Sequence, residues 1–376
     1  MASFIKSSQE EALELFPALE PQFRDVLASA YMTIQRIYFV FLRIEFYTSL
    51  IGILPTIFHL IILTRKPMRT SSVMSVMFGI AICDLFSMFS AIGTNSVIEN
   101  MKIEDCTPPN SYRAVKLWVF LQTVRDNAVR CSTWLSVLMA LFRFLMLKSV
   151  TSSKGPGRIG KFSFGFWTFG IALMISTMFS FVYSLRGQIV QVGTWKPAVD
   201  CPDQSMGSQP IYDNLVSELF QKAEIIRRTY MLLDELTSKI LPCFLFPILT
   251  GFLIIQFQRT QKKRHVFHVA KRGTELTTRL IIFMTISFFF ALLPTGIITC
   301  FSASYTDIGF LYLGSYVDHI CYALLTINAT LHCPICFAMC SQYRKTVLGV
   351  LKLSSSNSSS QQNTSTNSVV LAVRLT

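Results

Sequence analysis

Residues 73–92 read VMSVMFGIAICDLFSMFSAI, twenty residues with a single charged side chain, Asp84. The hydrocarbon core of a bilayer is roughly 30 Å thick, and a helix needs about 20 residues to cross it. We therefore expect this stretch to be a membrane-spanning helix.

Six further runs of the same kind lie along the chain. Hydrophobic residues make up 51% of the 376 positions, and only 15% are charged, against about 25% in an average soluble protein. This composition excludes a disordered chain and a coiled coil. The predicted fold is an all-α membrane protein with a bundle of seven transmembrane helices: Phe46–Leu63, Val73–Ile92, Trp118–Leu147, Phe162–Leu185, Ile240–Phe257, Leu280–Phe301 and Tyr316–Met339.

The segments between the spans fall into two sets by charge. Segments 64–71, 148–161, 258–273 and 341–376 contain 17 Lys and Arg and no acidic residue. Segments 1–37, 93–116, 186–230 and 302–311 contain 11 basic and 14 acidic residues. Because Lys and Arg mark cytoplasmic loops, we expect a plasma-membrane protein with an extracellular amino terminus and a cytosolic carboxyl terminus. The net charge of +13 then reflects topology, which removes the support for a nucleic-acid partner.

The predicted bundle covers residues 44–353, between an extracellular segment 1–43 and a tail 354–376. The tail is rich in Ser and Thr and too polar to bury, so we expect it to be disordered. Before it, Tyr343, Val347 and Leu351 share one face of a short helix with basic residues between them, a pattern that favours a membrane surface with anionic lipid. Cys340 is either a palmitoylation site or a free thiol.

The loop 186–230 is predicted in two halves. Residues 188–195 suggest a short hairpin, and apolar residues from Ile211 to Ile226 recur at helical spacing. Cys106 and Cys201 are the only cysteines clearly in outer loops, where oxidation is permitted. We expect them to be bridged.

Asp84 lies near the middle of its span, where an ionisable group is costly and is a functional candidate. It has no oppositely charged residue within one helical turn. One interpretation is a protonated or hydrogen-bonded strut between helices. The other is a buried site for a proton or a cation such as sodium.

Charges of both signs gather in the outer half of the predicted bundle. Asp126 and Arg130 are four residues apart and are expected to pair along their helix, which leaves Arg125 without an obvious mate. A water-filled cleft open to the outside tolerates such residues; the alternative is a set of intramembrane salt bridges with no ligand. The candidate ligand-binding residues are Arg125, Asp126, Arg130, Glu235, Lys239, Asp318, His319 and Tyr322.

Two features of the inner half suggest signal transmission. Arg143 ends an apolar run at the inner end of the third span, where an arginine is either an anchor that reaches the membrane surface or a functional residue. Pro294 interrupts the sixth span and predicts a kink that acts as a hinge. The chain carries no catalytic motif and no cofactor-binding motif, so an enzyme is not expected.

Taken together, the seven spans, Asp84, Arg143, Pro294 and several local runs resemble a rhodopsin-like G-protein-coupled receptor. The runs are Phe58-His-Leu-Ile-Ile-Leu-Thr-Arg-Lys-Pro-Met-Arg69, Cys131-Ser-Thr-Trp-Leu-Ser-Val-Leu-Met-Ala140 and Ser341-Gln-Tyr-Arg344. They resemble the nematode serpentine receptor class W, which is similar to FMRFamide-type neuropeptide receptors. The likeness covers about residues 40–350.

The chain departs from this pattern at two inner motifs. The superclass has Asp/Glu-Arg-Tyr where this chain has Phe142-Arg143-Phe144, and Glu275 is a candidate substitute partner for the arginine. The Asn-Pro-x-x-Tyr site reads His332-Cys-Pro-Ile-Cys336, which adds His332 to the expected transmission residues.

The resemblance implies a receptor for an extracellular ligand, expected to be a short neuropeptide. Asp126, Glu235 and Asp318 would meet a cationic ligand group, whereas Arg125 and Lys239 would meet a carboxylate. An outward swing of the sixth helix would free Arg143 to engage a heterotrimeric G protein, and the tail would serve arrestin and a receptor kinase. The alternatives are a chemosensory receptor for small environmental molecules, a transporter or channel, and a non-signalling binding partner.

Overall fold

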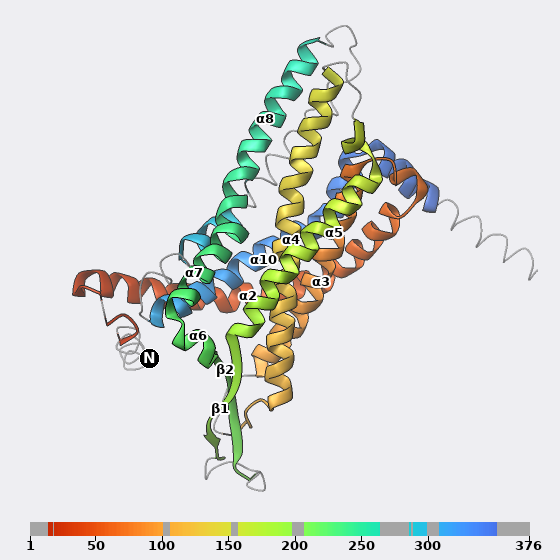
Figure 1. Cartoon of the computed structure of the whole chain (residues 1–376). Helices are drawn as coiled ribbons and strands as arrows, with labels where there is room; N and C mark the ends of the chain where they lie inside the picture. The colour runs from red at the N-terminus through yellow and green to blue at the C-terminus, as the bar shows by residue number, and fades with distance from the viewer. Residues whose placement is uncertain are drawn as a thin grey trace, which may run out of the picture.

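The computed structural model describes residues 14–17, 19–100, 106–151, 157–197, 207–263, 286, 289–298 and 308–351. Long helices dominate it, and a two-stranded hairpin projects from one end of the bundle (Figure 1). We call this the hairpin end and the opposite end, where α4 finishes and α5 begins, the far end. The long elements are α2 (Pro21–Leu63), α3 (Ser72–Asn100), α4 (Tyr112–Thr151), α5 (Phe162–Arg186), α8 (Leu241–Lys263) and α10 (Ile308–Met339).

The described residues include six helices that are long and apolar enough to cross a membrane. A seventh, shorter apolar helix, Phe289–Ile298, contains Pro294 and coincides with part of the predicted sixth span. This arrangement confirms the predicted seven-helix bundle, including the third span with its charged first half. Large apolar side chains such as Leu54 and Trp167 are 74% and 72% exposed, as expected for helices that face lipid.

The first helix is much longer than its hydrophobic run predicts. α2 has 43 residues, which correspond to about 65 Å at 1.5 Å per residue, twice the thickness of a hydrocarbon core. Its early turns project past the bundle in Figure 1. Phe16, just before the helix, is fully buried against Tyr31 and Phe310, so the start of α2 is fixed to the start of α10.

A π-helical turn, η3 (Leu236–Ile240), joins α7 (Glu224–Glu235) to α8. Pro242 has no N–H to donate to the carbonyl of Ser238, and its ring crowds that carbonyl. The turn widens: the N–H of Leu241 bonds to Leu236, five residues back. The carbonyl of Thr237 is left over and accepts the indole N–H of Trp134 at 3.1 Å.

The hairpin consists of β1 (Gly187–Trp195) and β2 (Gln209–Val216), paired antiparallel with a bulge between Gln191 and Gly193. The expected helical spacing from Ile211 to Ile226 is therefore wrong for its first part, which lies in β2, and correct from α6 (Glu218–Lys222) onwards. Residues 188–195, expected to form a hairpin by themselves, form the single strand β1. Cys106 is in a disulfide bond. Cys201, its predicted partner, lies outside the described residues.

Small residues let the helices approach closely. A Cβ atom built on Gly165 of α5 would lie 2.3 Å from the backbone carbonyl oxygen of Ser72 in α3. The backbones of these two helices therefore meet at a point that only glycine allows.

A helix over residues 341–351 follows α10 and packs on the far end. Its Tyr343 is fully buried, and the hydroxyl lies 2.9 Å from Nδ1 of His59. Burial raises the pKa of Tyr343 well above its ordinary value, so the phenol stays neutral. Cys340 at its start is not in a disulfide bond, so both palmitoylation and a free thiol stay open. The tail 354–376 lies outside the described residues.

Candidate functional site

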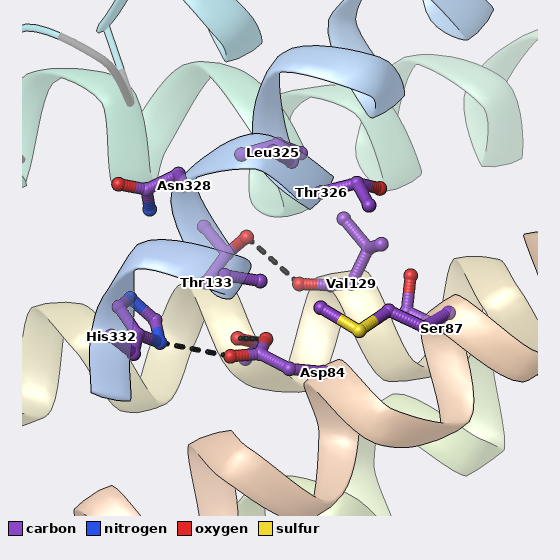
Figure 2. A pocket seen from close by; sticks show the side chains of 11 residues that line it. Asp84, Ser87, Val129, Thr133, Leu325, Thr326, Asn328 and His332 are labelled. Carbon is purple, nitrogen blue, oxygen red and sulfur yellow. Dashed lines mark hydrogen bonds and ion pairs between the residues drawn. The ribbon is translucent and has the colours of Figure 1, made fainter. Parts of the chain in front are cut away.

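Asp84 borders a small cavity between α3, α4 and α10 (Figure 2). The cavity has a volume of about 30 Å³, enough for one water-sized occupant because a site needs roughly 10–15 Å³. Its lining mixes oxygen-bearing with apolar side chains: Asp84, Ser87, Met88, Val129, Ser132, Thr133, Leu325, Thr326, Asn328, Ala329 and His332.

Both carboxylate oxygens of Asp84 have partners on other helices. Oδ1 accepts a hydrogen bond from Ser132 at 3.0 Å, and Oδ2 lies 2.9 Å from Nδ1 of His332. Figure 2 shows the imidazole pointing at the carboxylate. Two residues expected to transmit a signal, Asp84 and His332, therefore contact each other and join α3 to α10.

The sodium expectation at Asp84 meets a mixed donor set. Sodium is a hard cation that prefers oxygen ligands, and the carboxylate and the hydroxyl groups of the lining fit it in size and chemistry. His332 competes, because its ring already occupies Oδ2. Within the described ranges, no group of three or more His, Cys, Asp or Glu could hold a metal ion.

Arg125 lies nearer the hairpin end and pairs with Glu45 of α2, so the expectation that it has no mate is wrong. Both side chains are 0% exposed. The guanidinium carbon also lies 4.3 Å from the centre of the Tyr322 ring, within the range of a cation–π contact. Sequence reasoning missed Glu45 because it directly precedes the apolar run of the first span.

The expected pairing of Asp126 with Arg130 along α4 is also wrong. Arg130 forms an ion pair with Asp234 of α7 at 3.0 Å, and its Nε donates to Ser238 in the π turn at 2.8 Å. Asp126 instead accepts a 2.7 Å hydrogen bond from the hydroxyl of Tyr322. The side chains of Asp126 and Arg130 both point into the bundle, so they contact residues on neighbouring helices and not each other.

Lys239 stands at the end of the π turn between two carboxylates. Its Nζ lies 2.9 Å from Glu235 and 3.0 Å from Asp318 of α10. The Asp318 side chain is 27% exposed, the largest value among these ion-paired groups near the hairpin end. The widened turn places Ser238 against α4 and Lys239 against α10. In the sequence, only Pro242 indicated this turn.

His319 adds a polar group to the same region. Its Nδ1 lies 2.8 Å from the carbonyl oxygen of Ser315, and its ring packs edge-on against Tyr38 and Tyr322. The residue is 7% exposed, and Nε2 has no hydrogen-bond partner in the part of the chain that the structure describes.

Taken together, the structure brings all eight candidate ligand-binding residues to neighbouring positions. Contacts lead from the Arg125–Glu45 pair through Tyr322 to Asp126. A second set of contacts joins Lys239 to Glu235 and Asp318, and Asp318 is four residues from Tyr322 on α10. Arg130 stands four residues from Asp126 on α4, and His319 follows Asp318 on α10.

Arg143 lies on α4 near the far end, about 27 Å along the helix from Arg125 at 1.5 Å per residue. Its Nη2 lies 4.0 Å from the sulfur of Met77, and no carboxylate among the described residues pairs with it. Glu275, its expected substitute partner, lies outside the described residues. Pro294 lies in the described helix Phe289–Ile298.

The bundle, with a polar cluster near one end and Arg143 near the other, has the architecture of a seven-transmembrane receptor. Residues 43–354 match the family model described as serpentine type 7TM GPCR chemoreceptor Srw. The match spans most of the chain, and the protein therefore belongs to the Srw family of G-protein-coupled receptors. Compared with curated protein sequences, the chain gives no significant match.

Proposed function

We propose that this receptor binds a short extracellular peptide at the hairpin end and activates a heterotrimeric G protein at the far end. In this proposal the hairpin end faces outward from the plasma membrane. The observation that carries it is the buried network of ion pairs that links α2, α4, α7 and α10 near the hairpin end. Buried ionisable groups within a membrane are functional candidates because they are costly to keep there.

Three layers along α4 support a transmission path. Asp126 belongs to the network, Ser132 contacts Asp84, and Arg143 stands near the far end. At 1.5 Å per residue they are separated by about 9 Å and about 16 Å. A ligand that prefers one arrangement of α10 and α7 would shift the Asp84–His332 contact and, through α4 and the sixth helix about Pro294, the surroundings of Arg143.

A second ligand class has its own support. The family description names chemoreceptors, which favours small environmental molecules over a neuropeptide. Both classes would use the same network, so the choice between them is made by ligand screening. Arrestin and a receptor kinase acting on the Ser/Thr-rich tail complete the proposed set of partners.

The test is activation of G proteins in cells that express the full chain, with a panel of short peptides and small odorants and a dissociation readout for each G-protein class. Arg143→Ala is expected to abolish the response while surface expression is retained. The matched control is Arg113→Ala, an exposed arginine near the other end of the same helix. An Arg143→Ala receptor that signals like the wild type would contradict the proposed transmission role.

A further inference from the structure

The network near the hairpin end holds more carboxylates than cations. All its members are linked by the contacts described above or are neighbours on the same helix turn. It contains five acidic and three basic side chains: Glu45, Asp126, Asp234, Glu235 and Asp318, with Arg125, Arg130 and Lys239. With every group in its ordinary ionisation state, the network has a formal charge of −2.

The excess negative charge can be placed on particular residues. Arg125 has Glu45 to itself, and Arg130 has Asp234. Lys239 is shared between Glu235 and Asp318, which leaves one negative charge without a counter-ion. Asp126 provides the second, because its hydrogen-bond partner is the neutral phenol of Tyr322.

Arg125 and Lys239 already hold carboxylates, although Nε and Nη1 of Arg125 have no hydrogen-bond partner among the described residues. A ligand carboxylate at Arg125 would have to displace Glu45 from a pair that is completely buried, or else share the guanidinium with it. At Lys239 it would add a third carboxylate beside two that are already within 3.0 Å. Like charges at such short range in a poorly solvated site are strongly repulsive.

An independent feature also calls for a hydrogen-bond donor. Nδ1 of His319 faces a carbonyl oxygen, which only accepts, so Nδ1 carries the proton. Nε2 is then a bare acceptor, and it is buried without a partner among the described residues. A buried acceptor left unpaired is unfavourable. The ring of His319 packs edge-on against Tyr322, whose hydroxyl donates to Asp126, so His319 lies beside the same network.

We propose that the ligand carries a cationic amine or guanidinium group, which binds Asp318 with Asp126 nearby and donates a further N–H to His319. The inference rests on the proposed function, because it names the chemistry of the ligand that the receptor binds. Two expectations follow from the sequence: a ligand cation at the carboxylates, and a ligand carboxylate at Arg125 and Lys239. The proposal corresponds to the ligand cation. Asp318 is the contact nearest to solvent, since it is the most exposed of the ion-paired carboxylates in the network.

The experiment measures thermal unfolding of the full-length receptor in lipid nanodiscs with matched small probes. Phenethylamine is compared with 2-phenylethanol and 3-phenylpropionate, and arginine amide with citrulline amide, whose urea group is neutral but similar in shape. The cationic probes are expected to raise the unfolding temperature in a saturable way, and the neutral and anionic probes are not. Stabilisation by 3-phenylpropionate, or no stabilisation by either cation, would overturn the proposal.

Two variants then test the residues. Asp318→Asn keeps the side-chain shape and is expected to weaken binding of the cationic probes at least tenfold. Glu218→Gln removes a carboxylate from an exposed pair with Lys222, both 81% exposed, and is expected to leave binding unchanged. Equal weakening by both variants would show a general effect of surface charge and would contradict the assignment. The wild-type probe comparison stands even if Asp318→Asn fails to fold.

Failure of this inference is distinguishable from failure of the proposed function. Nucleotide exchange on G proteins added to the nanodiscs is measured in parallel. Cation binding without exchange would contradict the receptor mechanism and leave the ligand chemistry in place. Nucleotide exchange driven by a neutral or anionic compound would contradict the proposed ligand chemistry and leave the receptor mechanism in place.

Discussion

Replacing Glu45 with glutamine leaves the guanidinium of Arg125 buried without an anion. Both side chains are 0% exposed, so solvent does not screen the loss. Removing one partner of a buried ion pair costs about 3–5 kcal/mol, because the remaining charge is uncompensated. The cation–π contact with Tyr322 is present in both proteins and does not replace the lost anion. We therefore expect Glu45→Gln to destabilise the receptor by at least about 3 kcal/mol.

The assay is thermal unfolding in nanodiscs, together with the yield of folded protein at the cell surface. A double variant, Glu45→Leu with Arg125→Met, removes both charges and is expected to be far more stable than Glu45→Gln alone, since replacing a whole buried pair by apolar groups is often neutral. Glu218→Gln serves as the exposed control and should have little effect. The reasoning is refuted if Glu45→Gln lies within about 0.5 kcal/mol of the wild type or if the double variant is no better.

Three further predictions concern packing and the central cavity. Gly165→Ala is expected to cost about 1–3 kcal/mol through overpacking against α3, whereas Gly170→Ala on the same helix, where a Cβ meets nothing within 4 Å, should be neutral or stabilising in the same unfolding assay. Tyr343→Phe removes the hydrogen bond to the imidazole of His59 in α2 and should cost about 0.5–1.5 kcal/mol, with the yield at the cell surface lowered in parallel. If sodium binds at Asp84, exchanging NaCl for N-methylglucamine chloride at constant ionic strength will lower the unfolding temperature of the wild type and not of Asp84→Asn. Equal changes in the two proteins would show that sodium does not bind at Asp84.

The positions of the helices could be predicted because the bilayer imposes one requirement on each of them. Every span must bury its backbone polar groups and expose apolar side chains to lipid, and this leaves a continuous hydrophobic run in the sequence. Trp118–Leu147 was recognised on that basis despite Arg125, Asp126 and Arg130, and α4 covers it. The bounds were less accurate, because α2 continues for 25 residues before Phe46 as a helix that hydropathy does not mark.

The partners of the charged residues could not be predicted. Spacing of four residues along one helix is visible in a sequence, whereas the contacts of Arg130 with Asp234 and of Arg125 with Glu45 depend on how helices face each other. The same limit applies to the Asp84–His332 contact.

Local backbone detail was missed for a different reason. Apolar residues from Ile211 onwards fit a helical period, but the segment is an edge strand that pairs with β1 and whose register depends on that partner. The π turn before Pro242 was signalled only by the proline, whose presence shows that a helix is disturbed and not how the disturbance is absorbed.

The measurement that tests the central claim most directly is epitope accessibility at the two termini on cells that express the full chain. In the proposed receptor the hairpin end faces outward and Arg143 lies toward the cytosol. We therefore expect an amino-terminal tag to be labelled on intact cells and a carboxyl-terminal tag to be labelled only after permeabilisation. Labelling of the carboxyl-terminal tag on intact cells would place Arg143 on the side without G proteins and would contradict the account.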